Sequence, residues 1–83
     1  MNLVILSPEK EIFSGTVKSV TVPGSEGQLQ ILDRHAPIVS SLGKGAVKVV
    51  TAQGEKLNFT VSGGFVEVLN NEAALLVSGV AEA

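Results

Sequence analysis

One run of residues alternates between polar and apolar side chains without a break: Lys56-Leu57-Asn58-Phe59-Thr60-Val61-Ser62. This period of two is typical of a strand that has one side against a core. Two further strand-like runs, Gly64–Leu69 and Glu72–Val77, follow it. Asn70-Asn71 separates them, and asparagine tolerates the positive φ angles of a tight turn. The sequence therefore predicts three consecutive strands in this part of the chain.

The same pattern extends toward the N-terminus. Ala46–Thr51 predicts a strand, which the short turn Thr51–Glu55 joins to the alternating run. In Thr16–Val22 the apolar positions change parity, which fits a β-bulge near Lys18-Ser19. Other short strands are expected at Leu3–Leu6, Ile12-Phe13, Gln28–Leu32 and Ile38–Leu42.

No stretch keeps the apolar spacing of a helix for three turns. Strands separated by Gly, Pro and Asn are typical of a flattened β-sandwich or barrel, here of about ten short strands. The 83 residues leave room for one small core. We therefore expect a single all-β domain over residues 1–83.

Composition narrows the choice of partners. There are no cysteines, which excludes a disulfide scaffold, and the formal net charge of −2 gives no basic excess for nucleic acid. Charged residues make up 17% of the chain, below the usual share of about 25%. This apolar surplus suggests a surface covered by a permanent partner. The valine content of a β-rich chain is an alternative explanation.

Neither membrane insertion nor secretion is predicted. The longest apolar run, Ala73–Val77, is far shorter than the stretch of about 20 residues that a membrane helix needs. Met1-Asn2 leads directly into a strand-like run without the cationic start of a signal peptide. The sequence predicts an intracellular protein.

Catalytic chemistry is poorly supported. His35 is the single histidine, and Asp33, two residues away, cannot be assigned as its orienting partner from sequence. Ser41-Leu42-Gly43-Lys44 matches the S-x-x-K pattern of serine acyl enzymes, but not on the helix that this pattern requires. Gly24–Gly27 lacks the ending of a phosphate-binding loop. We expect no catalytic residue, no metal and no cofactor.

One long segment is more specific than an average hairpin. It runs from Val22-Pro23-Gly24-Ser25-Glu26-Gly27 through Ile31-Leu32-Asp33-Arg34-His35-Ala36-Pro37 to Leu42. It resembles the N-terminal domain of the ε subunit of the F-type ATP synthase (δ in mitochondria). Three further segments agree with that family in the same order: Leu6–Gly15, Leu42–Val47 and Ser62–Val68.

The resemblance implies a β-sandwich and a non-catalytic subunit of the rotor's central stalk, which docks on the γ subunit and the c-ring. It also implies a peripheral position on the cytoplasmic face of an energy-transducing membrane, for which we expect the bacterial inner membrane. The candidate residues for the c-ring are Glu26, Gln28, Asp33, Arg34 and His35. The candidate residues for the γ subunit are Ser7, Ser62, Gly63 and Gly64.

Two positions depart from the family pattern. Gln28 stands where an acidic residue is common, so a salt bridge to the ring is in doubt. Asp33-Arg34 replaces a common Pro-Gly, so this loop is expected to be reshaped. The chain also stops at Ala83, before the family's C-terminal helical hairpin, and we expect a natural short form rather than a trimmed piece.

Besides a small ligand-binding or enzyme domain, in which His35→Ala would abolish turnover, two other classes of protein are alternatives. Lys44 between two glycines could mimic the modified lysine of a lipoyl or biotin carrier domain, although the acidic or methionine neighbours of such lysines are missing. A free adaptor unrelated to the synthase is the second alternative. A carrier would show an added mass, whereas an adaptor would have no affinity for γ.

Overall fold

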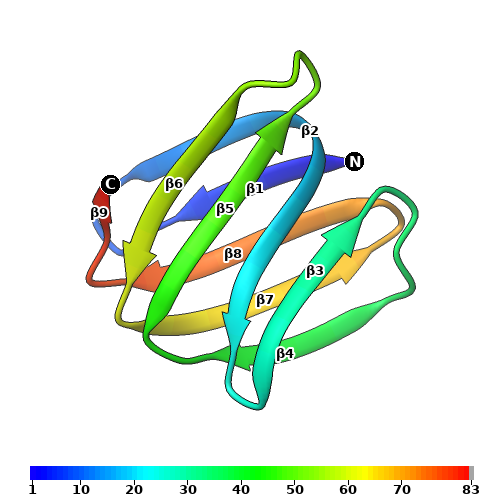
Figure 1. Cartoon of the computed structure of the whole chain (residues 1–83). Coiled ribbons are helices and arrows are strands. Elements are labelled where there is room, and N and C mark those ends of the chain that lie inside the picture. The colour runs from blue at the N-terminus through cyan, green and yellow to red at the C-terminus, as the bar shows by residue number, and fades with distance from the viewer. Residues whose placement is uncertain (83) are drawn as a thin grey trace.

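The structure, a computed structural model, describes residues 1–82. These residues form nine strands and no helix (Figure 1), which confirms the all-β prediction. The strands are β1 Asn2–Leu6, β2 Glu11–Gly24, β3 Gly27–Leu32, β4 Ile38–Leu42, β5 Gly45–Thr51, β6 Lys56–Val61, β7 Gly63–Leu69, β8 Glu72–Ser78 and β9 Ala81–Glu82.

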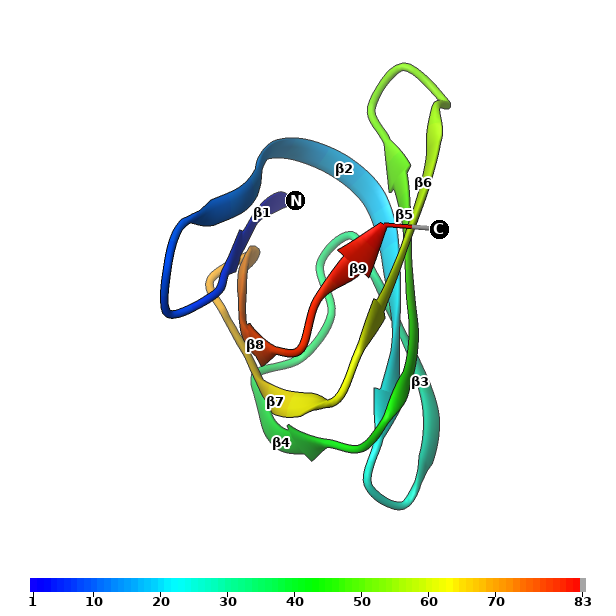
Figure 2. The ribbon, with the colours of Figure 1, turned by 90° about the vertical axis from the view of Figure 1, so that its left-hand side faces the viewer.

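The strands form two layers packed face to face, as Figure 2 shows from the side. One layer contains β6, β5, the second half of β2, and β3; the other contains β1, β8, β7 and β4. All neighbouring strands are antiparallel except β1 and β8, which are parallel. The molecule is therefore a flattened β-sandwich.

The long strand β2 joins the two layers. Its first half pairs with β1, and its second half pairs with β3 and β5. The sequence predicted two separate strands here, at Ile12-Phe13 and Thr16–Val22, whereas the structure has one strand of 14 residues. The predicted bulge is confirmed, because the register with β5 shifts between Val17 and Ser19. Such a bulge reverses the parity of the side chains, and this hid the continuity of β2 in the sequence.

The core lies between the layers and consists of the inward side chains of both. Val20, Val22, Ile31, Val66 and Leu75 are completely buried. Described side chains leave no buried nitrogen or oxygen without a hydrogen bond. The alternation read from the sequence thus corresponds to one apolar layer sealed between two sheets.

Turn geometry confirms one prediction and adds an unexpected residue. Asn70 and Asn71 join β7 to β8 with φ angles of 52° and 61°. Arg34, in the loop between β3 and β4, also has a positive φ, at 65°. This is the left-handed region that glycine adopts without strain. Arg34 therefore adopts a backbone conformation that most residues with a side chain avoid.

Candidate functional site

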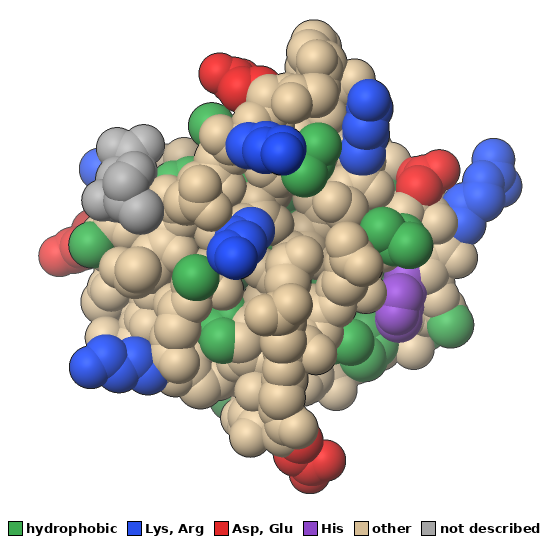
Figure 3. All heavy atoms as spheres, viewed as in Figure 1, with side chains coloured by type: hydrophobic (Ala, Val, Ile, Leu, Met, Phe, Trp, Pro, Cys, Tyr) green, Lys and Arg blue, Asp and Glu red, His purple; other side chains and the backbone are tan. Residues whose placement is uncertain are grey.

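The two outer faces of the sandwich differ in chemistry. Over β6, β5, β2 and β3 the outward side chains include Lys48, Lys56 and Gln30, and they are exposed. Figure 3 looks onto this face and shows Lys and Arg side chains over it, with Asp and Glu at its margins. We call it the polar face.

The opposite face, over β1, β8, β7 and β4, carries four of the five large apolar side chains that are exposed among the described residues. Val39, Phe65 and Leu76 are 72%, 58% and 53% exposed, which is far from the burial expected of large apolar side chains. We call this surface the apolar face. Its outward apolar side chains are Val4, Leu6, Val39, Phe65, Leu69, Ala74 and Leu76.

Strand register places the side chains of the apolar face in rows. Leu76 lies between Leu6 on β1 and Phe65 on β7. These three residues form a continuous apolar row, because directly opposed side chains on one face of a sheet are in contact distance. We call this row the apolar end.

The acidic groups lie toward the other end of the same face. Glu67 pairs in register with Ala74, and Glu72 pairs with Leu69, so the two acids occupy diagonal positions on adjacent strands. Both are exposed, and among the described residues neither is in an ion pair. A hollow of about 570 Å³ is lined by both and by Val4 and Asn2. We call Glu67 and Glu72 the acidic end.

Ser7 and Gly64, two of the residues predicted to contact γ, meet beside the apolar end. They line a hollow of about 390 Å³ together with Leu6, Pro8 and Leu76. The Ser7 backbone N–H donates to the Lys10 carbonyl at 2.9 Å, and the Lys10 N–H donates to the Ser7 hydroxyl at 3.2 Å. Ser7 therefore holds the turn between β1 and β2.

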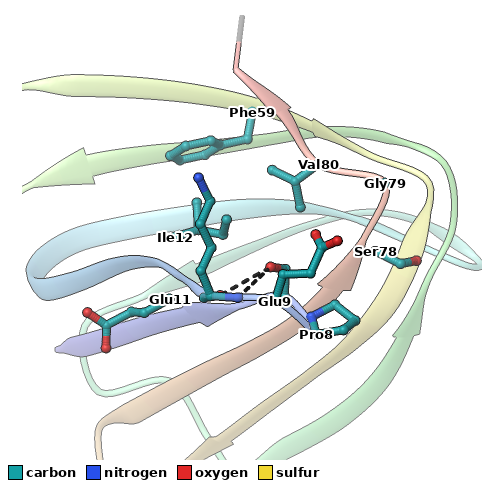
Figure 4. A pocket seen from close by; sticks show the side chains of 10 residues that line it. Pro8, Glu9, Glu11, Ile12, Phe59, Ser78, Gly79 and Val80 are labelled. Atoms are coloured by element: carbon teal, nitrogen blue, oxygen red, sulfur yellow. Dashed lines mark hydrogen bonds between the residues drawn. The ribbon is translucent and has the colours of Figure 1, made fainter.

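A third hollow, of about 520 Å³, adjoins the turn between β1 and β2. In Figure 4, Ile12, Phe59 and Val80 point into it, and Pro8 and Glu9 form its lower rim. It opens beside β9 and is separated from the apolar face by the turn. No predicted site residue except Ser7 lines it.

Contacts within the domain account for much of the Ser62-Gly63-Gly64 segment. A Cβ atom on Gly64 would overlap the Leu76 carbonyl oxygen and lie 2.9 Å from Val77 Cα, and the φ of Gly64 is +149°. The Ser62 N–H donates to the Ser78 carbonyl at 2.9 Å. The backbone of β8 in the same chain thus approaches Gly64 closely.

The five residues predicted to face the c-ring do not form one cluster. Glu26 lies in the turn between β2 and β3, and Gln28 lies at the start of β3. Asp33, Arg34 and His35 follow the other end of β3. A strand of this length separates its ends by about 17 Å. A single partner would therefore have to lie along β3 to contact all five.

Asp33 is held by contacts within the chain. The N-terminal ammonium of Met1 donates to its Oδ1 at 2.7 Å, and the Asn71 side chain donates to the same oxygen at 3.0 Å. The ammonium, and then the Asn71 amide, hold the pKa of the Asp33 carboxyl below its usual range. This contact contributes stability at neutral pH, which is lost as the pH falls through the lowered pKa.

Arg34 and His35 also take part in the loop. The Arg34 backbone N–H donates to the Asn71 side-chain oxygen at 2.7 Å. The Nδ1 atom of His35 is 2.7 Å from the Ala36 carbonyl oxygen, to which it donates as the protonated nitrogen. The Arg34 side chain is 88% exposed, so its guanidinium remains available to a partner.

The sequence did not single out the apolar face. Its signal was present, since Glu72–Val77 has apolar residues on both parities and a strand covered on one side should alternate. Phe65 and Leu76 have the outward parity, so β7 and β8 carry large apolar side chains on both of their faces. Only the register of the strands shows that these residues form one row.

Groups that could hold a metal are not found among residues 1–82, where no three His, Cys, Asp or Glu side chains converge. Within the same range, no helix is long and apolar enough to cross a membrane.

The fold and its surface define a small β-sandwich with one apolar outer face. Residues 1–83 match the family model described as "ATP synthase, Delta/Epsilon chain, beta-sandwich domain", so the chain belongs to this family. It is 47% identical over 77 residues to the ATP synthase epsilon chain of Leptospira borgpetersenii. These aligned residues make up 92% of this chain and 59% of that protein. The match to the epsilon chain of Nitratiruptor sp. is 40% identical over 79 residues, 95% of this chain and 61% of that protein.

Solved structures agree with the fold. A chain of the Euglena gracilis mitochondrial ATP synthase superposes with a TM-score of 0.87 at 23% identity, over 96% of this chain and 51% of that one. A chain from the Tetrahymena thermophila mitochondrial ATP synthase, in a structure of its central stalk and c-ring, gives 0.82 at 22% identity, over 99% and 66%. The chain spans about three fifths of the length of the curated relatives named above.

Proposed function

We propose that residues 1–83 form a single domain that works as a non-catalytic central-stalk subunit of an F-type ATP synthase. It docks on the γ subunit and on the c-ring and helps to couple proton flow to ATP synthesis. Its place is peripheral, on the cytoplasmic face of an energy-transducing membrane, which we propose to be a bacterial inner membrane. Family membership supports this role, and the apolar face provides its physical means.

The apolar face is the observation on which γ docking rests. Phe65, Leu76 and Val39 expose much of their apolar surface. A domain of this size has few other residues that could cover them. Contiguous apolar surface of this kind marks a protein interface more often than free surface. Ser7 and Gly64 lie at its apolar end, and Ser62 and Gly63 follow on the same side, so we propose these four as the rim of the γ interface.

Phe65→Asp tests γ docking. We expect the variant to bind γ at least about tenfold more weakly, because a carboxylate would have to be desolvated at the centre of an apolar contact. Affinity is measured by titration calorimetry against γ encoded by the same genome. Asn58→Asp, an equivalent change on the polar face, is the control and should bind like the wild type. A wild-type chain that does not bind γ would refute the proposed function.

For the c-ring, we propose that β3 lies along the ring, so that both of its ends touch it. Glu26 and His35 then report on opposite ends. The chain contains no cysteine, so Glu26→Cys and His35→Cys give single-thiol variants. We expect both to form disulfides with cysteines placed in the polar loop of the c subunit. Cross-linking from one end alone would show that the ring contacts that end and not the length of β3.

A further inference from the structure

The apolar face is polarised along its strands, and this constrains the segment that covers it. The row of Leu6, Leu76 and Phe65 lies at one end of the face, Glu67 lies two residues further along β7, and Glu72 lies at the other end. Leu76 and Glu72 are four residues apart on β8, which corresponds to about 13 Å. The face therefore presents an apolar contact and an anionic contact at a fixed separation.

Neither carboxylate is in an ion pair in the part of the chain that the structure describes. Among the described residues the ion pairs are those of Asp33 with Met1 and with Arg34, and neither includes Glu67 or Glu72. Lys48 and Lys56 project from the polar face, on the other side of the sandwich. Diagonal neighbours on a sheet lie about 7–8 Å apart, so the two like charges repel each other weakly in water. The repulsion would grow if an apolar partner excluded the water around them.

We infer that the partner segment on the apolar face carries a lysine or arginine that sits over Glu67 and Glu72, while its apolar side chains cover Leu6, Leu76 and Phe65. This inference rests on the proposed function and specifies the chemistry of the docking segment of γ. A cation between the two acids neutralises both and removes the penalty of covering them. A point between the two acids lies three residues along the strands from the apolar end, which is about 10 Å, so in a helical segment the basic residue would follow the apolar contact by about seven residues.

The hollow at the acidic end provides room for such a side chain. It has a volume of about 570 Å³ and is bordered by Val4, Ala74 and Leu69 as well as by the two acids. The aliphatic stem of a lysine or arginine can lie on these apolar groups while its charged head reaches the carboxylates. The ion pair would then fix the direction of the segment along the face, because reversal would place the cation over the apolar end.

The test compares two pairs of substitutions, each of which makes the net charge of the domain more positive by two. Glu67→Gln with Glu72→Gln removes the acidic end, and Gln53→Lys with Glu55→Gln makes the same change in net charge at exposed positions in the turn between β5 and β6. Affinity for purified γ is measured at low and at high salt. We expect the first pair to weaken binding at low salt by at least about tenfold and to reduce the salt dependence, and the second to stay within about twofold. Glu67→Asp with Glu72→Asp keeps the charges and should retain most of the affinity.

Each other outcome counts against the inference. If the first pair binds γ within about twofold of the wild type, no cation of γ uses the acidic end, although the proposed function stands. If both pairs of substitutions weaken binding to γ equally, the net charge of the domain determines the affinity and the acidic end has no specific part in it. If the wild-type chain itself fails to bind γ, the inference and the proposed function fall together.

Discussion

Gly64→Ala is expected to lower the free energy of unfolding by at least about 3 kcal/mol, because the new methyl group has no space and the backbone conformation is unfavourable for alanine. Its Cβ would overlap the Leu76 carbonyl oxygen and lie 2.9 Å from Val77 Cα. Both contacts are to backbone atoms of β8, which cannot move aside as a flexible side chain could. The residue also has a φ of +149°, which side-chain-bearing residues rarely adopt.

The chain has no Trp or Tyr, so unfolding is followed by far-UV circular dichroism in urea or on heating. A loss of about 3 kcal/mol corresponds to a fall in Tm of about 12–24 °C for a domain of this size. Gly63→Ala is the matched control, since its Cβ would meet the Leu42 carbonyl oxygen at an ordinary 3.5 Å and no positive φ is required. We expect the control to change stability by less than about 1 kcal/mol. Equal losses in both variants would contradict this explanation.

Much of the fold could be predicted because its strands and turns depend on the pattern of residues that are close together in the sequence. The alternation over Lys56–Ser62 corresponds to β6, and Asn70-Asn71 forms the predicted turn. The bulge near Lys18-Ser19 was visible as a change of parity. The continuity of β2 was not visible in the sequence, because its two halves follow different parities and pair with different strands.

The candidate site was less predictable because its parts are distant in the chain. The apolar end combines Phe65 and Leu76, which pair across β7 and β8, with Leu6, which joins them only through the parallel pairing of β1 with β8. The contacts of Asp33 with Met1 and Asn71 span 32 and 38 residues. Glu26 and His35 belong to one contiguous sequence segment, and only the structure shows that they lie at opposite ends of β3.

Leu75→Ala is expected to lower the free energy of unfolding by about 2–5 kcal/mol, since Leu75 is completely buried and truncation leaves a cavity between the two layers. Leu76→Ala, the adjacent residue on the same strand, should lower it by less than about 1 kcal/mol, because Leu76 is 53% exposed. Urea denaturation of the two variants measures the difference directly. Similar losses would mean that the apolar face is packed in the isolated domain.

The same two variants separate folding from docking. Leu76 gains burial only when a partner covers the apolar face, so its truncation should weaken γ binding by at least about tenfold while leaving the domain folded. Leu75 faces the core, so Leu75→Ala should bind γ with near wild-type affinity at temperatures where it remains folded. Two leucines adjacent in sequence would then report on different free energies, because alternation along β8 directs one inward and the other outward. A Leu76→Ala variant that binds γ normally would place the interface elsewhere on the sandwich.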